Sequence, residues 1–234
     1  MQGVDGQVYP AGTIEFLFKL TASGSGLMSL LDDSLFLMDF EKKLHGYLFD
    51  ESLTEFFHVH PQYEETQGSW ALQQELPVDG HYFFWVEGIV QGPSQTEVLK
   101  AGSTFRVLGG QPAHEKPALL LEQLSVSDQG SGAEIEFLDE LQTGRSVTFR
   151  VRFWREDGSI PQLGQYLGTS LHVTGASLAS GEMVHAHGMV FREQGQDVVY
   201  VSAVFPEAGS YRLWLQFVES EVLRTVPLSF EVRE

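Results

Sequence analysis

The sequence of 234 residues contains no cysteine. This absence excludes a disulfide scaffold, thiolate zinc sites, iron–sulfur ligation and a cysteine nucleophile. It also excludes the His–His–Cys site of blue-copper electron carriers. A metal ion bound to this chain would have to be held by histidine, methionine or carboxylate side chains.

Basic residues and long apolar runs are scarce as well. The 14 Lys and Arg residues stand against 32 Asp and Glu residues, so the net charge is −18. Such a charge repels phosphate backbones and anionic lipids, which argues against nucleic-acid and membrane-surface partners and favours the capture of cations. No run reaches the roughly 18 apolar residues of a membrane span. We therefore expect no nucleic-acid partner and no membrane span.

Short runs that alternate apolar and polar residues indicate β-strands. The clearest runs are residues 14–20, 147–153 and 211–217, and the 24 glycines and 9 prolines fall between such runs. Alternation with period two is typical of half-buried strands. Helical periodicity is weak, with room for a turn or two at 27–40 and at 137–142. The pattern predicts an all-β protein.

An internal duplication divides the chain. Three histidines recur 127 residues downstream, and residues 76–82 recur as 205–211. Repeats of this kind indicate two copies of one structural unit. We predict a first lobe at 1–109, a Gly- and Pro-containing linker at 110–117 and a second lobe at 118–234. The repeated histidines are His45, His58 and His60 in the first lobe and His172, His185 and His187 in the second.

A Pro-x-x-Gly-x-Tyr block precedes a strand in each lobe and ends at Tyr82 and Tyr211. This pattern is typical of the tyrosine corner of immunoglobulin-type folds, in which the tyrosine hydroxyl bonds back to the backbone. Together with the lobe size, it predicts two tandem Ig-like or cupredoxin-like antiparallel β-sandwiches.

The histidine spacing is suited to a metal ion. Residues two apart in a strand share a face and lie about 6.6 Å apart, so the pairs His58/His60 and His185/His187 can converge. The third histidine lies 13 residues earlier, a length that suits a return strand. Each lobe therefore carries a His-x12-His-x-His candidate site. The alternative is an inherited hydrogen-bond cluster without metal.

Two methionines extend the histidine pattern of the second lobe. Met183 and Met189 flank His185 and His187 at strand spacing. Thioether and imidazole ligands together suit copper. Alternatively, methionine fills gaps in hydrophobic cores. The first lobe has Phe56 and Gln62 at these positions, so the second lobe should favour the softer ion.

The runs at 44–47, 57–61 and 76–82 resemble the YtkA-like and FixH-like group of small extracytoplasmic bacterial β-sandwich domains. Residues 166–172, 185–187 and 205–217 resemble a second copy, with Gly188 in place of the proline that follows the first His pair. The resemblance implies a periplasmic or extracellular protein from which a signal or anchor has been removed, and a link to copper handling.

Three functions compete at this point. The first is a non-enzymatic protein that sequesters or delivers a metal, copper first and zinc second, with a partner protein in metal transfer. The second is a metalloenzyme: three histidines with an open position are a zinc hydratase or hydrolase set, and His58, His60 and Glu64 match part of the cupin motif. The third is a metal-free interaction module with a surface formed by Trp70, Trp85, Trp154 and Trp214.

Overall fold

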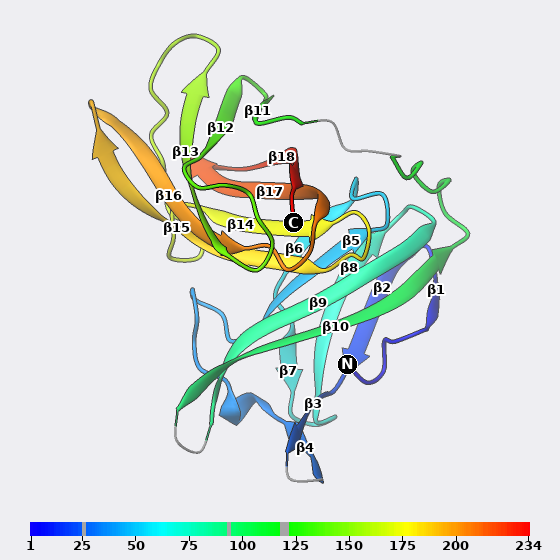
Figure 1. Cartoon of the computed structure of the whole chain (residues 1–234). Helices are drawn as coiled ribbons and strands as arrows, with labels where there is room; N and C mark the ends of the chain where they lie inside the picture. Colours follow the sequence, from blue (N-terminus) through cyan, green and yellow to red (C-terminus); the bar gives the residue numbers. More distant parts are fainter. Residues whose placement is uncertain (25–26, 93–94, 118–121) are drawn as a thin grey trace. The chain divides into compact units, whose positions relative to one another are not determined.

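The computed structural model describes residues 1–24, 27–92, 95–117 and 122–234, with the backbone alone for 22–24 and 27–29. Strands make up 65% of the chain. Within these ranges there is no α-helix, and so no helix that could cross a membrane. The chain forms two compact units, Met1–Lys116 and Pro117–Glu234, and each is described by itself below (Figure 1).

The first unit contains three sheets. One sheet has the order β1-β10-β9-β5-β6, a second β2-β8-β7 and a third β3-β4. A 3-10 turn, η1, follows β4. The elements are β1 (Val8–Pro10), β2 (Gly12–Phe18), β3 (Leu20–Gly24), β4 (Leu27–Leu31), η1 (Asp33–Leu35), β5 (His45–Asp50), β6 (Phe56–Val59), β7 (Gln62–Glu64), β8 (Ser69–Leu76), β9 (Gly80–Gln91) and β10 (Thr96–Leu108).

The second unit is built around one continuous sheet with the order β11-β12-β13-β16-β15-β14-β17-β18. Strand β15 pairs with β14 as far as His187 and with β16 from Gly188 onward, so it joins two groups of strands. The strands are β11 (Ser125–Asp128), β12 (Ser131–Phe137), β13 (Ser146–Arg155), β14 (His172–Ser177), β15 (Met183–Glu193), β16 (Gln196–Val204), β17 (Gly209–Glu219) and β18 (Val222–Val232).

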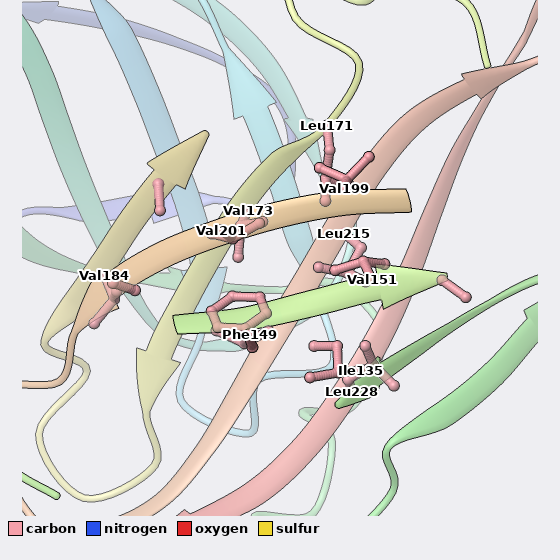
Figure 2. Packing of buried hydrophobic residues seen from close by; sticks show 14 of the residues in the cluster. Ile135, Phe149, Val151, Leu171, Val173, Val184, Val199, Val201, Leu215 and Leu228 are labelled. Atoms are coloured by element: carbon pink, nitrogen blue, oxygen red, sulfur yellow. The ribbon is translucent and has the colours of Figure 1, made fainter. Parts of the chain in front are cut away.

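Alternating side chains of the strands fill a separate hydrophobic core in each unit. In β2, Ile14, Phe16 and Phe18 are buried while the residues between them are exposed. In β13, Phe149 and Val151 are buried while Arg150 between them is only partly exposed, and the two buried residues pack with residues of β14, β16, β17 and β18 (Figure 2). Burial of one face of each strand stabilises the sheets by roughly 25 cal/mol per Å² of apolar surface.

The tyrosine corner predicted in both lobes is present. The Tyr82 hydroxyl donates to the Val78 carbonyl at 3.0 Å, and the Tyr211 hydroxyl donates to the Glu207 carbonyl at 3.2 Å. Burial, together with nearby carboxylates, raises the pKa of both phenols, that of Tyr211 to about 12. Each bond ties the start of a central strand, β9 or β17, to the turn that precedes it.

The helical turns considered from the sequence are mostly not formed. Residues 27–40 contain β4 and only the 3-10 turn η1. The prediction for 137–142 is wrong, because the backbone there pairs with distant segments. Leu138 N–H donates to the Thr148 carbonyl, and Gln142 forms a bridge with Arg233. Hydrogen bonds to partners far along the chain override a weak local pattern.

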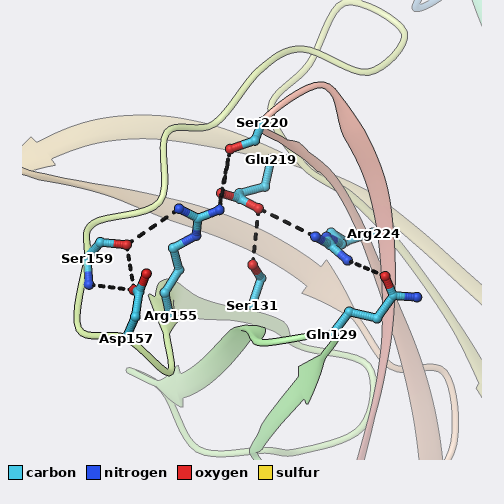
Figure 3. Close-up of polar contacts among 8 residues, drawn as sticks. All are labelled: Gln129, Ser131, Arg155, Asp157, Ser159, Glu219, Ser220 and Arg224. Atoms are coloured by element: carbon cyan, nitrogen blue, oxygen red, sulfur yellow. Dashed lines mark hydrogen bonds and ion pairs between the residues drawn. The ribbon is translucent and has the colours of Figure 1, made fainter.

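A buried ion cluster closes one end of the second unit. Glu219, the last residue of β17, is fully buried, and its carboxylate lies 2.8 Å from an Arg155 amino group and 3.8 Å from one of Arg224. Ser131 donates a hydrogen bond of 3.0 Å to the same carboxylate (Figure 3). The cluster ties β12, β13, β17 and β18 together, and loss of one partner would leave charge buried without compensation.

The boundary between the two units lies between Lys116 and Pro117. Part of the segment expected to be a linker is bonded to the first unit: Gln111 N–H donates to the Pro77 carbonyl, and His114 lies 2.9 Å from Glu55. Residues 118–121 lie outside the described part of the chain.

Candidate metal centres

The three histidines of the first unit lie together. His45 begins β5, His58 lies in the neighbouring β6, and His60 follows β6. His45 Nδ1 is 3.2 Å from His58 Nε2, and the ring centroids of His58 and His60 are 4.8 Å apart. One ligand nitrogen from each ring lies within 4.8 Å of the others. The predicted cluster is therefore present as a geometric arrangement.

The second unit repeats this arrangement. His172 in β14 pairs directly with His187 in β15, and Thr174 pairs with His185, so the three imidazoles share one face. The centroids of His185 and His187 are 4.4 Å apart, and those of His172 and His187 are 4.8 Å apart. Again one ligand nitrogen of each ring lies within 4.8 Å of the others. Each unit thus forms its own triad.

Each buried histidine is held by a backbone carbonyl six residues earlier. His45 Nε2 lies 3.0 Å from the Asp39 carbonyl oxygen, and His172 Nε2 lies 3.0 Å from that of Tyr166. A carbonyl can only accept, so Nε2 carries the proton and Nδ1 carries the lone pair. A hydrogen bond of this kind fixes the tautomer and the ring orientation of a metal-binding histidine.

The carbonyls belong to equivalent tight turns that the sequence reasoning did not identify. Residues 39–42 and 166–169 each close a two-residue turn with reciprocal backbone hydrogen bonds between their ends. The central residues have positive φ: 44° and 66° for Phe40 and Glu41, 49° and 75° for Leu167 and Gly168. Positive φ at both positions is typical of a type I′ turn. The two turns lie 127 residues apart, as the histidines do, but their residues share no identity, and only Gly168 is a local signal for such a turn.

Both triads combine a buried histidine with a more open pair. His45 is 1% exposed and His172 is fully buried, whereas the other four rings are partly exposed. Burial, with smaller contributions from His45 and Lys42, lowers the pKa of His60 to about 4. A neutral imidazole is the form that binds metal, so this environment keeps His60 ready to act as a ligand at neutral pH.

The two methionines differ in their surroundings. Met183 pairs with Ala176 in β14 and is 1% exposed. Met189 follows the point where β15 changes partners, pairs with Tyr200 of β16 and is 68% exposed. The predicted row of four ligands along one strand face is therefore divided by the change of pairing at Gly188. Only Met183 is a buried thioether on the strand segment that carries the His pair.

The residues behind the other two functional hypotheses are arranged less favourably. Glu64, the acidic residue of the partial cupin motif, is exposed on β7 in a different sheet from His45 and His58. A hollow of about 190 Å³ is lined by Lys42, Pro61 and other residues rather than by the histidines. Of the tryptophans, Trp70 and Trp214 are buried, and Trp85 and Trp154 are partly exposed.

Comparisons with known proteins give a family match for the second unit. Residues 126–234 match the model of a domain of unknown function, DUF8832. A search of curated proteins found no match.

Solved structures with some likeness include a DUF4426 family protein from Pseudomonas aeruginosa PAO1, with 7% identity and a TM-score of 0.36 over 46% of this chain and 94% of that one. A β-glucuronidase from Parabacteroides merdae has 10% identity and a TM-score of 0.23 over 97% of this chain and 23% of its own. The D00-D0 domain of intimin has 10% identity and a TM-score of 0.23 over 97% and 95% of the two chains. These likenesses are too distant to bear on function.

Proposed function

We propose that this protein binds copper, with zinc as the second candidate, and sequesters or delivers the ion without redox chemistry. The observation that supports this most is the duplicated triad: three imidazoles gather in each unit, with ligand nitrogens within 4.8 Å of one another. Strand pairing dictates which face a side chain occupies but does not require imidazole there. Six histidines at equivalent positions therefore favour a shared chemical role.

The geometry is close to what a metal ion needs. Metal–nitrogen bonds of about 2.0–2.1 Å bring two imidazole nitrogens of a tetrahedral site to about 3.3 Å from each other. His45 Nδ1 and His58 Nε2 are already 3.2 Å apart. The partly exposed pair in each unit leaves a side through which an ion can enter and leave, as delivery requires.

Copper is placed before zinc for two reasons. Nitrogen sites bind Cu²⁺ more tightly than the other divalent ions of the first transition row, and the thioether of Met183 suits Cu⁺. The net charge of −18 concentrates cations around the protein and supports capture. Without cysteine, the chain lacks the thiolate of blue-copper electron carriers, so storage or transfer is proposed rather than electron transport.

We further propose a specific fold for the two units and a periplasmic or extracellular location for the protein. The two β-sandwich units are taken as tandem Ig-like or cupredoxin-like domains, supported by the tyrosine corners at Tyr82 and Tyr211. The resemblance to YtkA-like and FixH-like domains supports a periplasmic or extracellular protein that exchanges metal with a partner protein.

Elemental analysis and titration test the proposal. Protein purified without an affinity tag should contain copper, and metal-free protein should take up two ions per chain. The variant His58→Ala with His185→Ala should lose both binding events. His81→Ala, which changes a histidine outside both triads, is the matched control and should bind as the wild type does. Unchanged copper uptake by the double variant would disprove the proposal.

A further inference from the structure

The two triads share their three histidines and a tryptophan in the adjacent strand, Trp85 opposite Tyr47 and Trp214 opposite Thr174, but differ at three other neighbouring positions of the same face. Register places Phe49 opposite Phe56 in the first unit and Ala176 opposite Met183 in the second. The pairs occupy equivalent positions in the repeat. At this position the first unit has two aromatic rings. The second unit has the methyl group of Ala176 and the thioether of Met183 instead.

A second difference lies beside the His pair. Tyr47 pairs with His58, and its ring stacks on that imidazole with centroids 4.8 Å apart. The equivalent residue opposite His185 is Thr174, which is buried and too short to cover an imidazole ring. The tyrosine ring therefore restricts the His58 imidazole in the first triad. No aromatic ring occupies the equivalent position opposite His185 in the second triad.

The third difference is one of charge. On the strand beside the buried histidine, Glu87 lies opposite His45 and Gln216 lies opposite His172. Gln216 is 5% exposed and donates to Thr225 Oγ1 at 3.2 Å. The first triad therefore has a carboxylate in the adjacent row, and the second has a neutral amide there. Lys100 lies opposite Glu87 in β10, and its ammonium group is also 4.7 Å from the centroid of the Trp85 ring.

We propose that the two units bind copper in different oxidation states: the second unit selects Cu⁺ with Met183 as a ligand beside its triad, and the first unit selects a divalent ion. This inference rests on the proposed metal-binding function and adds to it the chemical form of each cargo. Soft thioether sulfur favours Cu⁺, while nitrogen and oxygen donors favour divalent ions. A nearby carboxylate further favours the ion of higher charge.

Met183, rather than Met189, is the residue assigned to this role. Met183 is two residues from His185 on the β14-paired segment, so both side chains lie on one face, and its burial limits the positions of its sulfur. Met189 lies beyond the change of partners and is 68% exposed. It provides a matched control in the same strand.

The test measures each site alone in the full chain. His58→Ala leaves the second site and His185→Ala leaves the first. Cu⁺ affinity is measured by competition with bicinchoninate, and Co²⁺ serves as a coloured divalent probe. We expect Cu⁺ to bind more tightly to the His58→Ala protein than to the His185→Ala protein. For Co²⁺ we expect the opposite order, with tighter binding to the His185→Ala protein. In the His58→Ala background, Met183→Leu should weaken Cu⁺ binding about tenfold or more and remove sulfur from the copper X-ray absorption spectrum, whereas Met189→Leu should change neither.

Leucine is close to methionine in volume, so Met183→Leu should fold, and thermal unfolding of the metal-free protein checks this directly. If both sites bind metal but Met183→Leu retains its Cu⁺ affinity and shows no loss of sulfur, the assignment of Met183 is wrong while the metal-binding function stands. Equal preferences of the two single-site proteins would overturn the separation by oxidation state. Absence of any metal uptake by the wild type would instead refute the proposed function itself.

Discussion

The two units carry the same triad in different frameworks. In the first unit, the strand that carries His58 ends at Val59, and the chain re-enters a different sheet at Gln62 after Pro61. In the second, β15 continues without a break and changes partners at Gly188. The histidines and their backbone anchors are common to both units, while the path of the chain beyond the His pair is not. The histidines and their anchors therefore do not depend on one particular path of the chain after the His pair.

The ring geometry shows how far that freedom extends. His45 and His58 are tilted by 35° with centroids 5.5 Å apart, whereas His172 and His185 are parallel within 3° and 6.2 Å apart. Tyr47 stacks on the His58 ring, whereas the equivalent Thr174 has no ring that could stack on His185. The anchor of the buried histidine is nevertheless 3.0 Å long in both units. The backbone anchor is therefore constant, and the side-chain neighbours adjust the open pair.

The largest expected difference between the units comes from the buried carboxylate of the second. Glu219→Ala leaves Arg155 and Arg224 without their partner and should lower the free energy of unfolding of the second unit by about 3–5 kcal/mol. Val90 lies at the equivalent position of the first unit, and Val90→Ala should cost less. Hydrogen exchange followed by mass spectrometry, which reports on each unit separately, measures both effects. Equal losses in the two units would show that the ion cluster contributes little.

The next largest effect concerns the residue after the His pair. A Cβ atom at Gly188 would lie 2.1 Å from Val199 Cγ1, so Gly188→Ala should destabilise the second unit by about 1–3 kcal/mol. It should also weaken the proposed metal binding at the second triad, because His187 is the adjacent residue. Pro61→Ala, the equivalent change in the first unit, adds no atom to the core. Urea unfolding of the two variants compares them, and a tolerated alanine at 188 would show that the two cores are equally adaptable there.

The features that the sequence predicted are those that local pattern determines. Alternating strands, the tyrosine corners and the convergence of each His-x-His pair with the earlier histidine follow from period two and from the repeat itself. The separation of Met189 from Met183 could not be predicted, because it depends on where β15 changes from β14 to β16. Pairing between strands distant in sequence sets that position, and no local pattern encodes it.

The turns that anchor the buried histidines were missed for a related reason. Leu167-Gly168 has a glycine where positive φ is needed, but Phe40-Glu41 has no residue that indicates such a turn. The side chains of Asp39 and Tyr166 have nothing in common, since only their carbonyl oxygens take part. A role carried by the backbone leaves almost no trace in side-chain chemistry.

Acid should destabilise the metal-free first unit through protonation of His60 in the unfolded state. Its pKa is lowered to about 4 in the folded protein, against about 6.5 in an unfolded chain. Above pH 6.5 the ring is neutral in both states and contributes no pH dependence. Between pH 6.5 and 4 the unfolded state gains a proton that the folded state does not, so the free energy of unfolding of the metal-free protein falls as the pH falls, and this contribution levels off below pH 4. Chelator-treated His60→Gln should show a shallower decline than the wild type, with His81→Gln as the control, and superimposable curves would contradict the expectation.

The smallest expected effect is a difference in stability between the two turns whose carbonyls hold the buried histidines. Glu41 has a φ of 66°, which costs a residue with a Cβ atom about 1–2 kcal/mol, while the equivalent Gly168 has a φ of 75° without that cost. Because glycine also loses more chain entropy on folding, Glu41→Gly should stabilise the first unit by only about 0.5–1 kcal/mol, and Gly168→Glu should destabilise the second by a similar amount. Glu41→Ala, which removes the side chain but keeps the Cβ atom, should bring no gain in thermal unfolding. If alanine stabilises as much as glycine does, the strain lies in the Glu41 side chain rather than in the turn that presents the Asp39 carbonyl to His45.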